Sequence, residues 1–178
     1  MAWQLRRAVA ADLDSIMQLE NSVFGTDAWS ADSMMGELSS DHCWYVVAFR
    51  PETPKLIEAY AGLHAPSCSA TADIQTIAVA PTARRAGLGR TIVRTLINEA
   101  MKRGATEVFL EVRADNPGAE SLYRSLGFEQ IAVRKRYYQP DNVDALVMCL
   151  IPARREAAFA PTETPSSHQQ QDVGGEKQ

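Results

Sequence analysis

Residues 74–89 constrain most strongly what this chain can fold into. β-branched and small apolar side chains fill most of 74–79, as they do in a strand, and Pro81 ends the strand because proline fixes φ and donates no hydrogen bond. The following turn holds Gly87 and Gly89, where a ligand can approach the backbone because no Cβ is present. The first N–H groups of a helix that begins there attract anions. The stretch therefore predicts a strand, a loop and a helix start that hold a phosphate group, although an ordinary strand-to-helix loop would share these glycines.

Hydrophobic spacing surrounds this unit with further strands and helices. Strands are expected at 4–9, 44–49, 56–63, 107–113, 129–137 and 145–150, and helices at 11–24, from 30 onward, from 88 to 101 and at 119–126. The order β, α, α, β, β, β, α, β, α, β, β predicts a mixed sheet and an α/β (α+β mixed) fold class, since hairpins stand at both ends. Strict alternation along the central strand would put Ile74, Thr76 and Ala78 on one face. We expect one domain, 1–152, followed by a Pro-, Ser- and Gln-rich tail, 153–178, which is predicted to be disordered.

The composition of the whole chain excludes several classes of function. With 178 residues, 46% of them hydrophobic, the chain can bury a core. Its net charge of -4 argues against direct binding of nucleic acid, and no apolar run suits a membrane span or a signal peptide. The 3 cysteines are scattered and form neither a metal spacing nor a disulfide framework. This pattern predicts no metal site and a reducing, cytoplasmic location.

The glycine loop narrows the choice of ligand. No Gly-Lys-Ser/Thr follows it, so it is not a Walker loop, and it lacks the third glycine and the acidic partner of a dinucleotide fingerprint. What remains is Arg84 followed by Gly87 and Gly89. This pattern, Arg-x-x-Gly-x-Gly, resembles the pyrophosphate-binding motif of the GCN5-related N-acetyltransferase (GNAT) family, whose cofactor is acetyl-coenzyme A (acetyl-CoA). Residues 110–116 (Leu-Glu-Val-Arg-Ala-Asp-Asn) and 122–128 (Leu-Tyr-Arg-Ser-Leu-Gly-Phe) resemble the ribosomal-protein-alanine N-acetyltransferase (RimI) branch of that family.

The resemblance covers most of residues 3–151, and 28–30 and 134–138 also match that branch. It implies the GNAT acyl-CoA N-acyltransferase fold, a central mixed, splayed β-sheet with helices on both faces and acetyl-CoA in the splay. The resemblance implies three groups of residues that bind acetyl-CoA: one along the pantetheine arm, one around the pyrophosphate and a single residue at a strand end. In that order they are Ile77, Ala78 and Val79, then Arg84, Arg85, Ala86, Gly87, Leu88, Gly89 and Arg90, and finally Asn116. The backbone N–H of Val79 is implied to polarise the thioester oxygen. Asn116 also has the residue type of a local helix cap, and both roles can hold together.

Glu111 is the candidate general base. An amine must lose a proton before it attacks a thioester, and an N-terminal α-amine has a pKa of about 7.7–8.0, so a base of modest strength suffices. A carboxylate partly withdrawn from water is a stronger base. From the spacing alone, an ion pair with Arg113, two residues along on the same face, is the favoured explanation of Glu111. The resemblance instead assigns Glu111 the base role, directly or through a water.

Tyr123 is the candidate general acid that donates a proton to the leaving coenzyme A thiolate. A phenol keeps its proton at neutral pH because its ordinary pKa is about 10. The resemblance places Tyr123 in this role. Judged from the residues alone, Tyr123 instead packs between a short helix and the sheet, with its hydroxyl bonded to backbone.

Three aromatic residues are candidates for binding the substrate: Trp29, Tyr137 and Tyr138. Each also has a purely structural reading, because Trp29 can be a packing residue and strand tyrosines pack on their neighbours. The basic run 134–136 alternates in direction along a strand and forms no single stripe. We therefore interpret it as a solvated rim and not as a nucleic-acid patch.

Together these features predict an N-terminal protein acetyltransferase. It would move acetyl from acetyl-CoA to the α-amine of a protein, the alanine of a small-subunit ribosomal protein, by direct attack and without an acyl-enzyme, since no cysteine sits in a catalytic motif. The expected partners are acetyl-CoA and an N-terminal peptide, with no membrane and no nucleic acid, for a monomer or weak dimer. Three alternatives stay open: a GNAT enzyme that acetylates a small-molecule amine, an enzyme with relaxed N-terminal or lysine acetylation of several proteins, and a regulatory module that binds acetyl-CoA without turnover.

Overall fold

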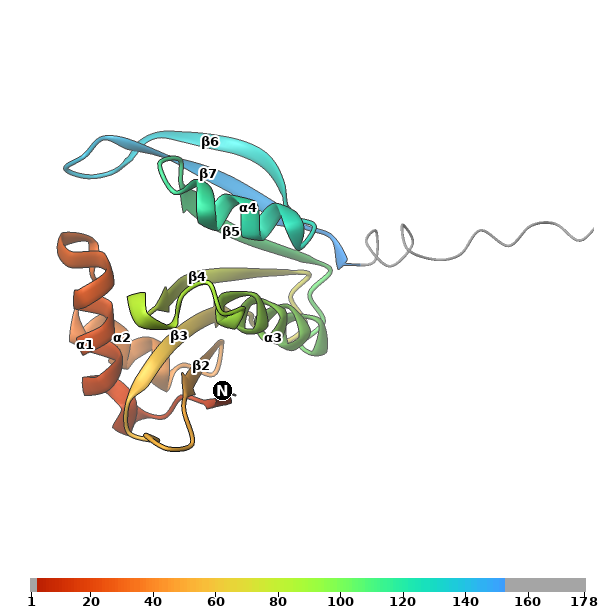
Figure 1. The fold of residues 1–178 in the computed structure, drawn as a ribbon. Coiled ribbons are helices and arrows are strands. Elements are labelled where there is room, and N and C mark those ends of the chain that lie inside the picture. The colour runs from red at the N-terminus through yellow and green to blue at the C-terminus, as the bar shows by residue number, and fades with distance from the viewer. Residues whose placement is uncertain (1–2, 153–178) are drawn as a thin grey trace, which may run out of the picture.

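The computed structural model describes residues 3–152, so the predicted tail, 153–178, lies outside the described residues. The strands are β1 (Gln4–Arg7), β2 (Cys43–Phe49), β3 (Ile57–His64), β4 (Thr71–Val79), β5 (Glu107–Arg113), β6 (Glu129–Tyr138) and β7 (Val143–Leu150). The helices are α1 (Leu13–Phe24), α2 (Ala31–Ser39), α3 (Leu88–Lys102) and α4 (Pro117–Ser125), with the short turns η1 (Ala10–Asp12), η2 (Gly25–Asp27) and η3 (Pro81–Ala83). The predicted order of strands and helices is confirmed (Figure 1).

One mixed sheet runs in the order β1-β2-β3-β4-β5-β7-β6. Every neighbouring pair is antiparallel except β4 and β5, which run parallel. These two strands pair only from Thr71 with Glu107 to Ile74 with Leu110. Beyond that point they separate, and Figure 1 shows the two halves of the sheet opening away from each other. The expected splayed sheet with helices on both faces is confirmed, and the splay exposes one edge of each central strand.

A bulge between β3 and β4 overturns the expected alternation along the central strand. The register shifts so that Gly62 pairs with Thr76 while Leu63 pairs with Ile74, which leaves Gln75 as the additional residue. Ile74 therefore packs in the core beneath α3, whereas Ala78 packs in the core on the opposite face. The prediction that Ile74 and Ala78 share one face was wrong because a bulge resets the two-residue period.

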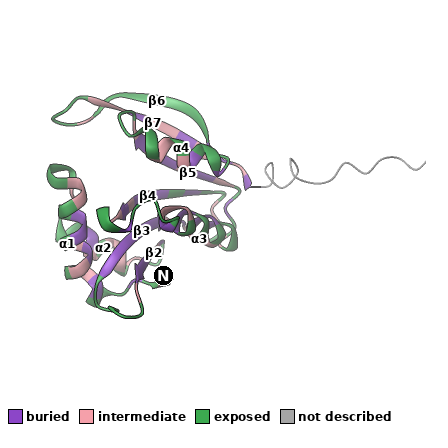
Figure 2. Ribbon diagram, in the orientation of Figure 1, coloured by how far each residue is buried: buried purple, intermediate pink, exposed green. Residues whose placement is uncertain are grey.

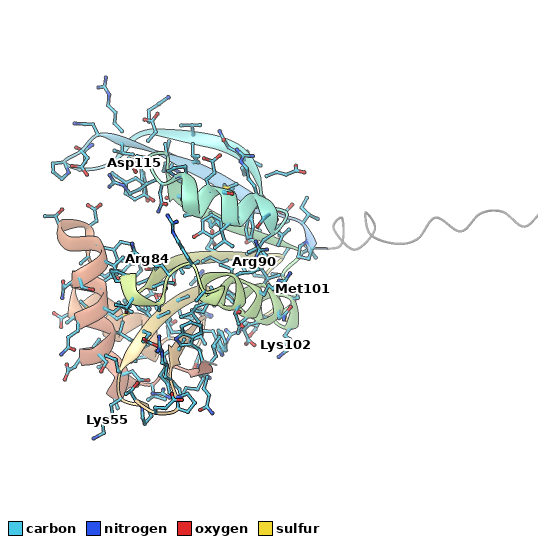
Figure 3. The ribbon with its side chains drawn as sticks, viewed as in Figure 1. Lys55, Arg84, Arg90, Met101, Lys102 and Asp115 are labelled. Atoms are coloured by element: carbon cyan, nitrogen blue, oxygen red, sulfur yellow. The ribbon has the colours of Figure 1, made fainter. Side chains whose placement is uncertain are left out.

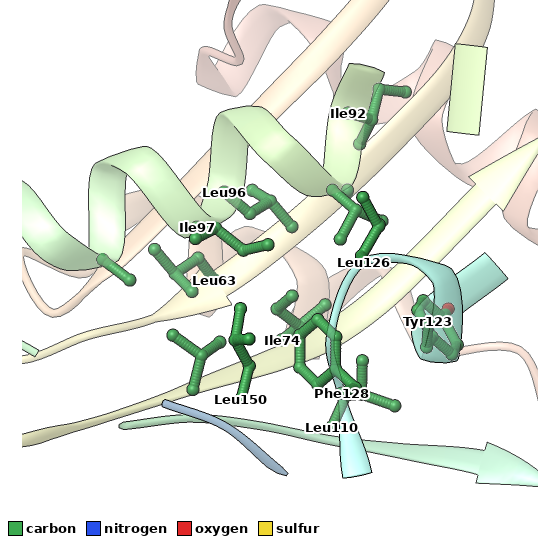
Figure 4. Close-up of a cluster of buried hydrophobic side chains, with 14 of the residues drawn as sticks. Leu63, Ile74, Ile92, Leu96, Ile97, Leu110, Tyr123, Leu126, Phe128 and Leu150 are labelled. Carbon is green, nitrogen blue, oxygen red and sulfur yellow. The ribbon is translucent and has the colours of Figure 1, made fainter. Parts of the chain in front are cut away.

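Two hydrophobic clusters fill the two faces of the sheet. The larger lies beneath α3 and α4, where α3 buries side chains at helical spacing: Leu88, Ile92, Val93, Leu96, Ile97 and Ala100. Figure 4 shows Leu96 and Ile97 of α3 above Leu63 and Ile74, with Leu126 and Phe128 closing the same cluster. The smaller cluster lies between β2, β3 and β4 and the two helices α1 and α2. The edge strand β6 is exposed along nearly its whole length (Figure 2).

A buried carboxylate joins α1 to the sheet and to the segment before α2. Glu20 is fully buried and accepts a hydrogen bond from the Tyr60 hydroxyl, which itself lies 3.4 Å from the Thr76 hydroxyl. The other Glu20 oxygen accepts from the Trp29 backbone N–H at 2.9 Å. A buried polar group is stable only when its hydrogen bonds are made, so this contact fixes where Trp29 sits relative to β3 and β4.

Replacing Tyr60 by Phe should therefore destabilise the fold measurably. The variant keeps the ring but removes the donor, which leaves one oxygen of a buried carboxylate without its partner and should lower the free energy of unfolding by about 1–3 kcal/mol. Urea unfolding followed by fluorescence measures the loss. The same substitution at the exposed Tyr137 is the matched control and should change stability by less than about 0.5 kcal/mol. Equal, small effects at both positions would contradict a stabilising role for the Glu20–Tyr60 contact.

Candidate active site

Glu111 lies on β5 one residue beyond the last pair with β4. Along β5 the half-exposed Phe109, Glu111 and Arg113 alternate with three buried residues that face the core under α3 and α4. The Glu111 side chain is 26% exposed, and its Oε1 lies 3.0 Å from Nε of Arg134. Arg134 reaches it from β6 across the intervening strand β7. The ion pair expected between Glu111 and Arg113 was therefore wrong, because Arg113 binds other carboxylates.

Tyr137 and Tyr138 surround the same carboxylate. The pKa of Tyr137 is raised, first by its hydrogen bond to Glu111, and burial followed by the nearby Glu111 charge raises the pKa of Tyr138 to about 12. The two rings pack edge to face with centroids 5.2 Å apart. Both phenols therefore remain protonated at neutral pH, and they form a wall beside Glu111 on the open face of β5.

Tyr123 comes from α4 and approaches β5 from the opposite face. Its ring is buried and packs edge to face on Phe128, with centroids 5.9 Å apart. Burial is the first cause that raises the pKa of Tyr123 to about 12, so the phenol is neutral at physiological pH. Within residues 3–152 the hydroxyl has no hydrogen-bond partner, although no fully enclosed side-chain oxygen is left unsatisfied. The expected packing is confirmed, but the backbone bond expected for the hydroxyl was wrong.

Glu111 and Tyr123 thus lie on opposite faces of β5. In a continuous sheet they could not act on one substrate, because the neighbouring strand would separate them. They can do so only where β4 no longer pairs with the edge of β5, which is the position Glu111 occupies. A base on one face and an acid on the other suit a reaction in which the attacking group and the leaving group lie on different sides of one carbonyl carbon.

The loop after β4 has the geometry of an anion site. Arg85 and Gly87 both adopt positive φ, 60° and 84°, and Gly87 precedes the first residue of α3 without a side-chain cap. A Cβ added at Gly87 would meet no atom within 4 Å, so open space faces the backbone there. The uncapped N–H groups of the first turn, helped by the helix dipole, can bind a phosphate in that space.

Arginines flank this loop. Nε of Arg84 donates to the Val79 carbonyl at 3.0 Å, which ties the loop back to the end of β4. Arg90 donates to Oγ of Ser125 at 2.8 Å, which joins the start of α3 to the end of α4. Figure 3 shows Arg84 and Arg90 beside the region where the two halves of the sheet separate. Together with the exposed Arg85, they make this end of the splay electropositive.

The remaining candidates occupy four different places. The backbone of Ile77, Ala78 and Val79 forms the part of β4 that no longer pairs with β5. Asn116 caps α4, because its Oδ1 accepts from the Ala119 N–H at 3.1 Å, so the local cap is confirmed. Trp29 packs partly buried on the cluster beneath α1, so packing accounts for much of its side chain. Leu88 is buried in the core, which leaves only its backbone for a ligand.

Two features of the site were missed by the sequence reading. Arg134 was interpreted as part of a solvated rim, yet it pairs with Glu111, and its guanidinium lies 5.5 Å from the Tyr137 ring centroid. Arg113 joins three carboxylates at the end of β5. Between residues 3 and 152, no group of three or more His, Cys, Asp or Glu side chains could hold a metal ion. No helix in that range could cross a membrane.

Comparison with known proteins decides the family. Residues 12–128 match the acetyltransferase (GNAT) family. This chain belongs to the GNAT family. It is an acetyl-CoA-dependent N-acetyltransferase of that family.

Individual proteins resemble this chain in sequence and in structure. The chain is 37% identical over 141 residues to N-alpha-acetyltransferase RimI of Mycobacterium tuberculosis, covering 78% of this chain and 85% of that protein. It is 39% identical over 152 residues to an uncharacterised protein of Mycobacterium leprae, but it spans only 39% of that protein's length. The crystal structure of the ribosomal-protein-S18-alanine N-acetyltransferase of Escherichia coli superposes with a TM-score of 0.75 at 29% identity, covering 84% of this chain and 93% of that one.

The residues present fit acetyl-CoA. The open backbone at Gly87, the uncapped start of α3 and the flanking arginines suit a pyrophosphate. The unpaired edge of β4 offers backbone groups to the amides of a pantetheine arm, much as a sheet edge receives an added strand. The donor set therefore matches both the charged and the amide-bearing parts of this molecule.

Proposed function

We propose that this GNAT enzyme acetylates the N-terminal α-amine of a protein. The substrate we favour is the alanine terminus of a small-subunit ribosomal protein, which would place the enzyme in the cytoplasm. The observation that carries the proposal is Glu111 on the open face of β5, walled by Tyr137 and Tyr138, at the point where β4 and β5 separate. Support comes from two names: the mycobacterial relative is called an N-alpha-acetyltransferase, and the E. coli enzyme is called a ribosomal-protein-S18-alanine N-acetyltransferase.

The proposed reaction is a direct transfer in which acetyl-CoA supplies the acetyl group as a thioester. Glu111 takes a proton from the substrate ammonium, directly or through a water, and frees the nitrogen to attack. Tyr123 gives its proton to the sulfur that leaves from the other side. The Val79 N–H would polarise the thioester oxygen. Residues 77–79, the loop 84–90 and Asn116 would hold the acetyl donor, while Trp29, Tyr137 and Tyr138 would contact the peptide.

The buried Cys43 is a poor candidate for a covalent intermediate. Burial is the first cause that raises the pKa of Cys43 to about 11, and the thiol donates to Oε2 of Glu37 at 2.8 Å. A protonated thiol in that setting is a poor nucleophile. Cys43 is therefore not a candidate to carry an acyl group.

The test mixes the purified protein with acetyl-CoA and peptides that differ only in their first residue. Release of free coenzyme A measures turnover, and mass spectrometry locates the acetyl group. Acetyl on the α-amine of the alanine peptide supports the proposal. Turnover only with polyamines or aminoglycosides would replace the protein by a small amine as substrate, and binding of acetyl-CoA without turnover on any acceptor would make the chain a regulatory module.

Replacing Gly89 by Ala should weaken binding of acetyl-CoA without harming the fold. Gly89 lies in the first turn of α3, and an added Cβ would meet only Cδ2 of Leu122, at 3.5 Å, an ordinary contact. A pyrophosphate that approaches this turn closely would collide with the new methyl group. We expect the KM for acetyl-CoA to rise about tenfold, which corresponds to about 1.4 kcal/mol.

The matched control for this prediction is Gly36→Ala. Gly36 lies in α2, where an added Cβ meets nothing within 4 Å. Both variants should melt at or above the wild-type temperature because alanine favours a helix. An unchanged KM for acetyl-CoA in Gly89→Ala would place the pyrophosphate elsewhere.

A further inference from the structure

One arginine at the end of β5 binds carboxylates from three separate segments. Nη1 of Arg113 lies 3.0 Å from Oδ2 of Asp27 in η2, and Nη2 lies 3.0 Å from Oδ2 of Asp141 in the β6–β7 turn. Nε and Nη2 also contact the two oxygens of Asp115, each at 3.0 Å. The guanidinium lies 5.1 Å from the ring centroid of Tyr138.

Two of these contacts join parts of the chain that are distant in sequence. Asp27 precedes Arg113 by 86 residues and Asp141 follows it by 28. Figure 1 shows the tip of the β6–β7 hairpin close to the end of α1, at the open end of the splay. Asp115, in contrast, is two residues from Arg113 and joins nothing distant. We call Arg113, Asp27 and Asp141 the loop bridge.

The magnitude of these ion pairs argues against a role in overall stability. The side chains of Arg113, Asp27 and Asp141 are 26%, 28% and 57% exposed. Ion pairs that contact water are typically worth about 0–1 kcal/mol. The loop bridge therefore adds little to the stability of the whole fold, but it can still fix the separation of two segments that are otherwise anchored far apart.

Those two segments carry the candidate substrate contacts. Trp29 follows Asp27 by two residues, and its backbone is held by the buried Glu20. Tyr138 lies against Arg113 itself and precedes Asp141 by three residues. The loop bridge thus connects the segment that contains Trp29 with the segment that contains Tyr138, and we call these segments the two walls of the peptide site.

We propose that Arg113 is a positioning residue that holds these two walls at the separation an extended N-terminal peptide requires. The proposal rests on the proposed function, since it assigns the loop bridge to the peptide and not to acetyl-CoA. It predicts a selective effect: loss of the bridge raises the KM for peptide, while the KM for acetyl-CoA stays unchanged and kcat changes little.

The test compares three isosteric variants, Asp27→Asn, Asp141→Asn and Asp115→Asn. The first two should raise the KM for the alanine peptide about fivefold to tenfold, within the range of typical coupling energies, while Asp115→Asn should match wild type. Combining Asp27→Asn with Asp141→Asn should add less than the sum of the two, because either change alone opens the bridge. Arg113→Lys should recover part of the loss seen in Arg113→Gln, since one ammonium can replace some of the guanidinium contacts.

Hydrogen exchange gives a readout that does not need a substrate. In Arg113→Gln the amides of 25–30, Gln139, Asp141 and Asn142 should exchange faster than in wild type, with melting temperature little changed. Equal peptide KM in all variants, or an equal rise in the KM for acetyl-CoA, would overturn the proposal. If the wild type acetylates no peptide, the proposed function fails. Faster amide exchange of both segments in Arg113→Gln would then still support a loop bridge that holds them together. Unchanged amide exchange would contradict the loop bridge.

Discussion

Glu111→Gln should lower kcat at neutral pH by about a hundredfold or more, the range expected for loss of a general base. Glutamine has the shape of glutamate and can still accept the hydrogen bond from Tyr137, so the wall of the site should stay in place. It cannot take a proton from the substrate ammonium. Affinity for acetyl-CoA should be largely kept, because the loop 84–90 and the free edge of β4 lie apart from this carboxylate. Coenzyme A release at saturating substrate measures kcat, and calorimetry measures the affinity.

The pH dependence separates a base from a merely structural carboxylate. An N-terminal amine has a pKa of about 7.7–8.0, so at pH 9 most of it is already deprotonated. The ratio of the wild-type kcat to the Glu111→Gln kcat should therefore fall as pH rises from about 6.5 to 9. Glu107→Gln, the same change on the same face of β5 where that strand still pairs with β4, is the control and should match wild type. A ratio of the two kcat values that stays constant across pH would contradict a role for Glu111 in proton transfer.

The order of strands and helices could be predicted because its determinants are local. The helical spacing of apolar residues in α3, the proline and glycines after β4 and the strand patterns each depend on neighbours within a few positions. The bulge at Gln75 could not be predicted in this way, because it arises from the pairing of β3 with β4. A single additional residue there moved Ala78 to the face opposite Ile74, although the sequence alternates without a break.

The site shows the same division between local and distant determinants. Asn116 caps α4 through a residue three positions away, and this could be expected from the sequence. The partner of Glu111 could not, because Arg134 reaches it over an intervening strand whose register is set by the β6–β7 hairpin. The sequence spacing favoured Arg113 as the ion-pair partner of Glu111, because Arg113 lies on the same face of β5. In the folded chain, however, Arg113 binds three aspartates instead. Sequence reasoning finds which residue types are present, whereas competition between partners is decided only in the folded chain.

Tyr123→Phe should lower kcat by about a hundredfold, within the range for loss of a general acid, with little change in stability. The ring would keep its contact with Phe128, and the hydroxyl it loses has no partner within the described part of the chain. Removing such a group costs the fold little, because no buried acceptor is left unsatisfied. The expected activity loss arises at the leaving thiolate, which would depart without a proton. Single-turnover release of coenzyme A, measured beside urea unfolding, reports both quantities on one protein.

Comparison with Tyr60→Phe makes this prediction decisive for the role of Tyr123. Both variants remove one hydroxyl from a buried tyrosine, but only Tyr60 donates to a buried carboxylate. We expect Tyr60→Phe to lose stability and Tyr123→Phe to lose turnover. The loss in Tyr123→Phe should also diminish above pH about 8.5, the ordinary pKa of a thiol, because a thiolate that is stable in solution needs no donor. Full activity of Tyr123→Phe at pH 7 would assign the acid to another group and leave Tyr123 as a packing residue beneath α4.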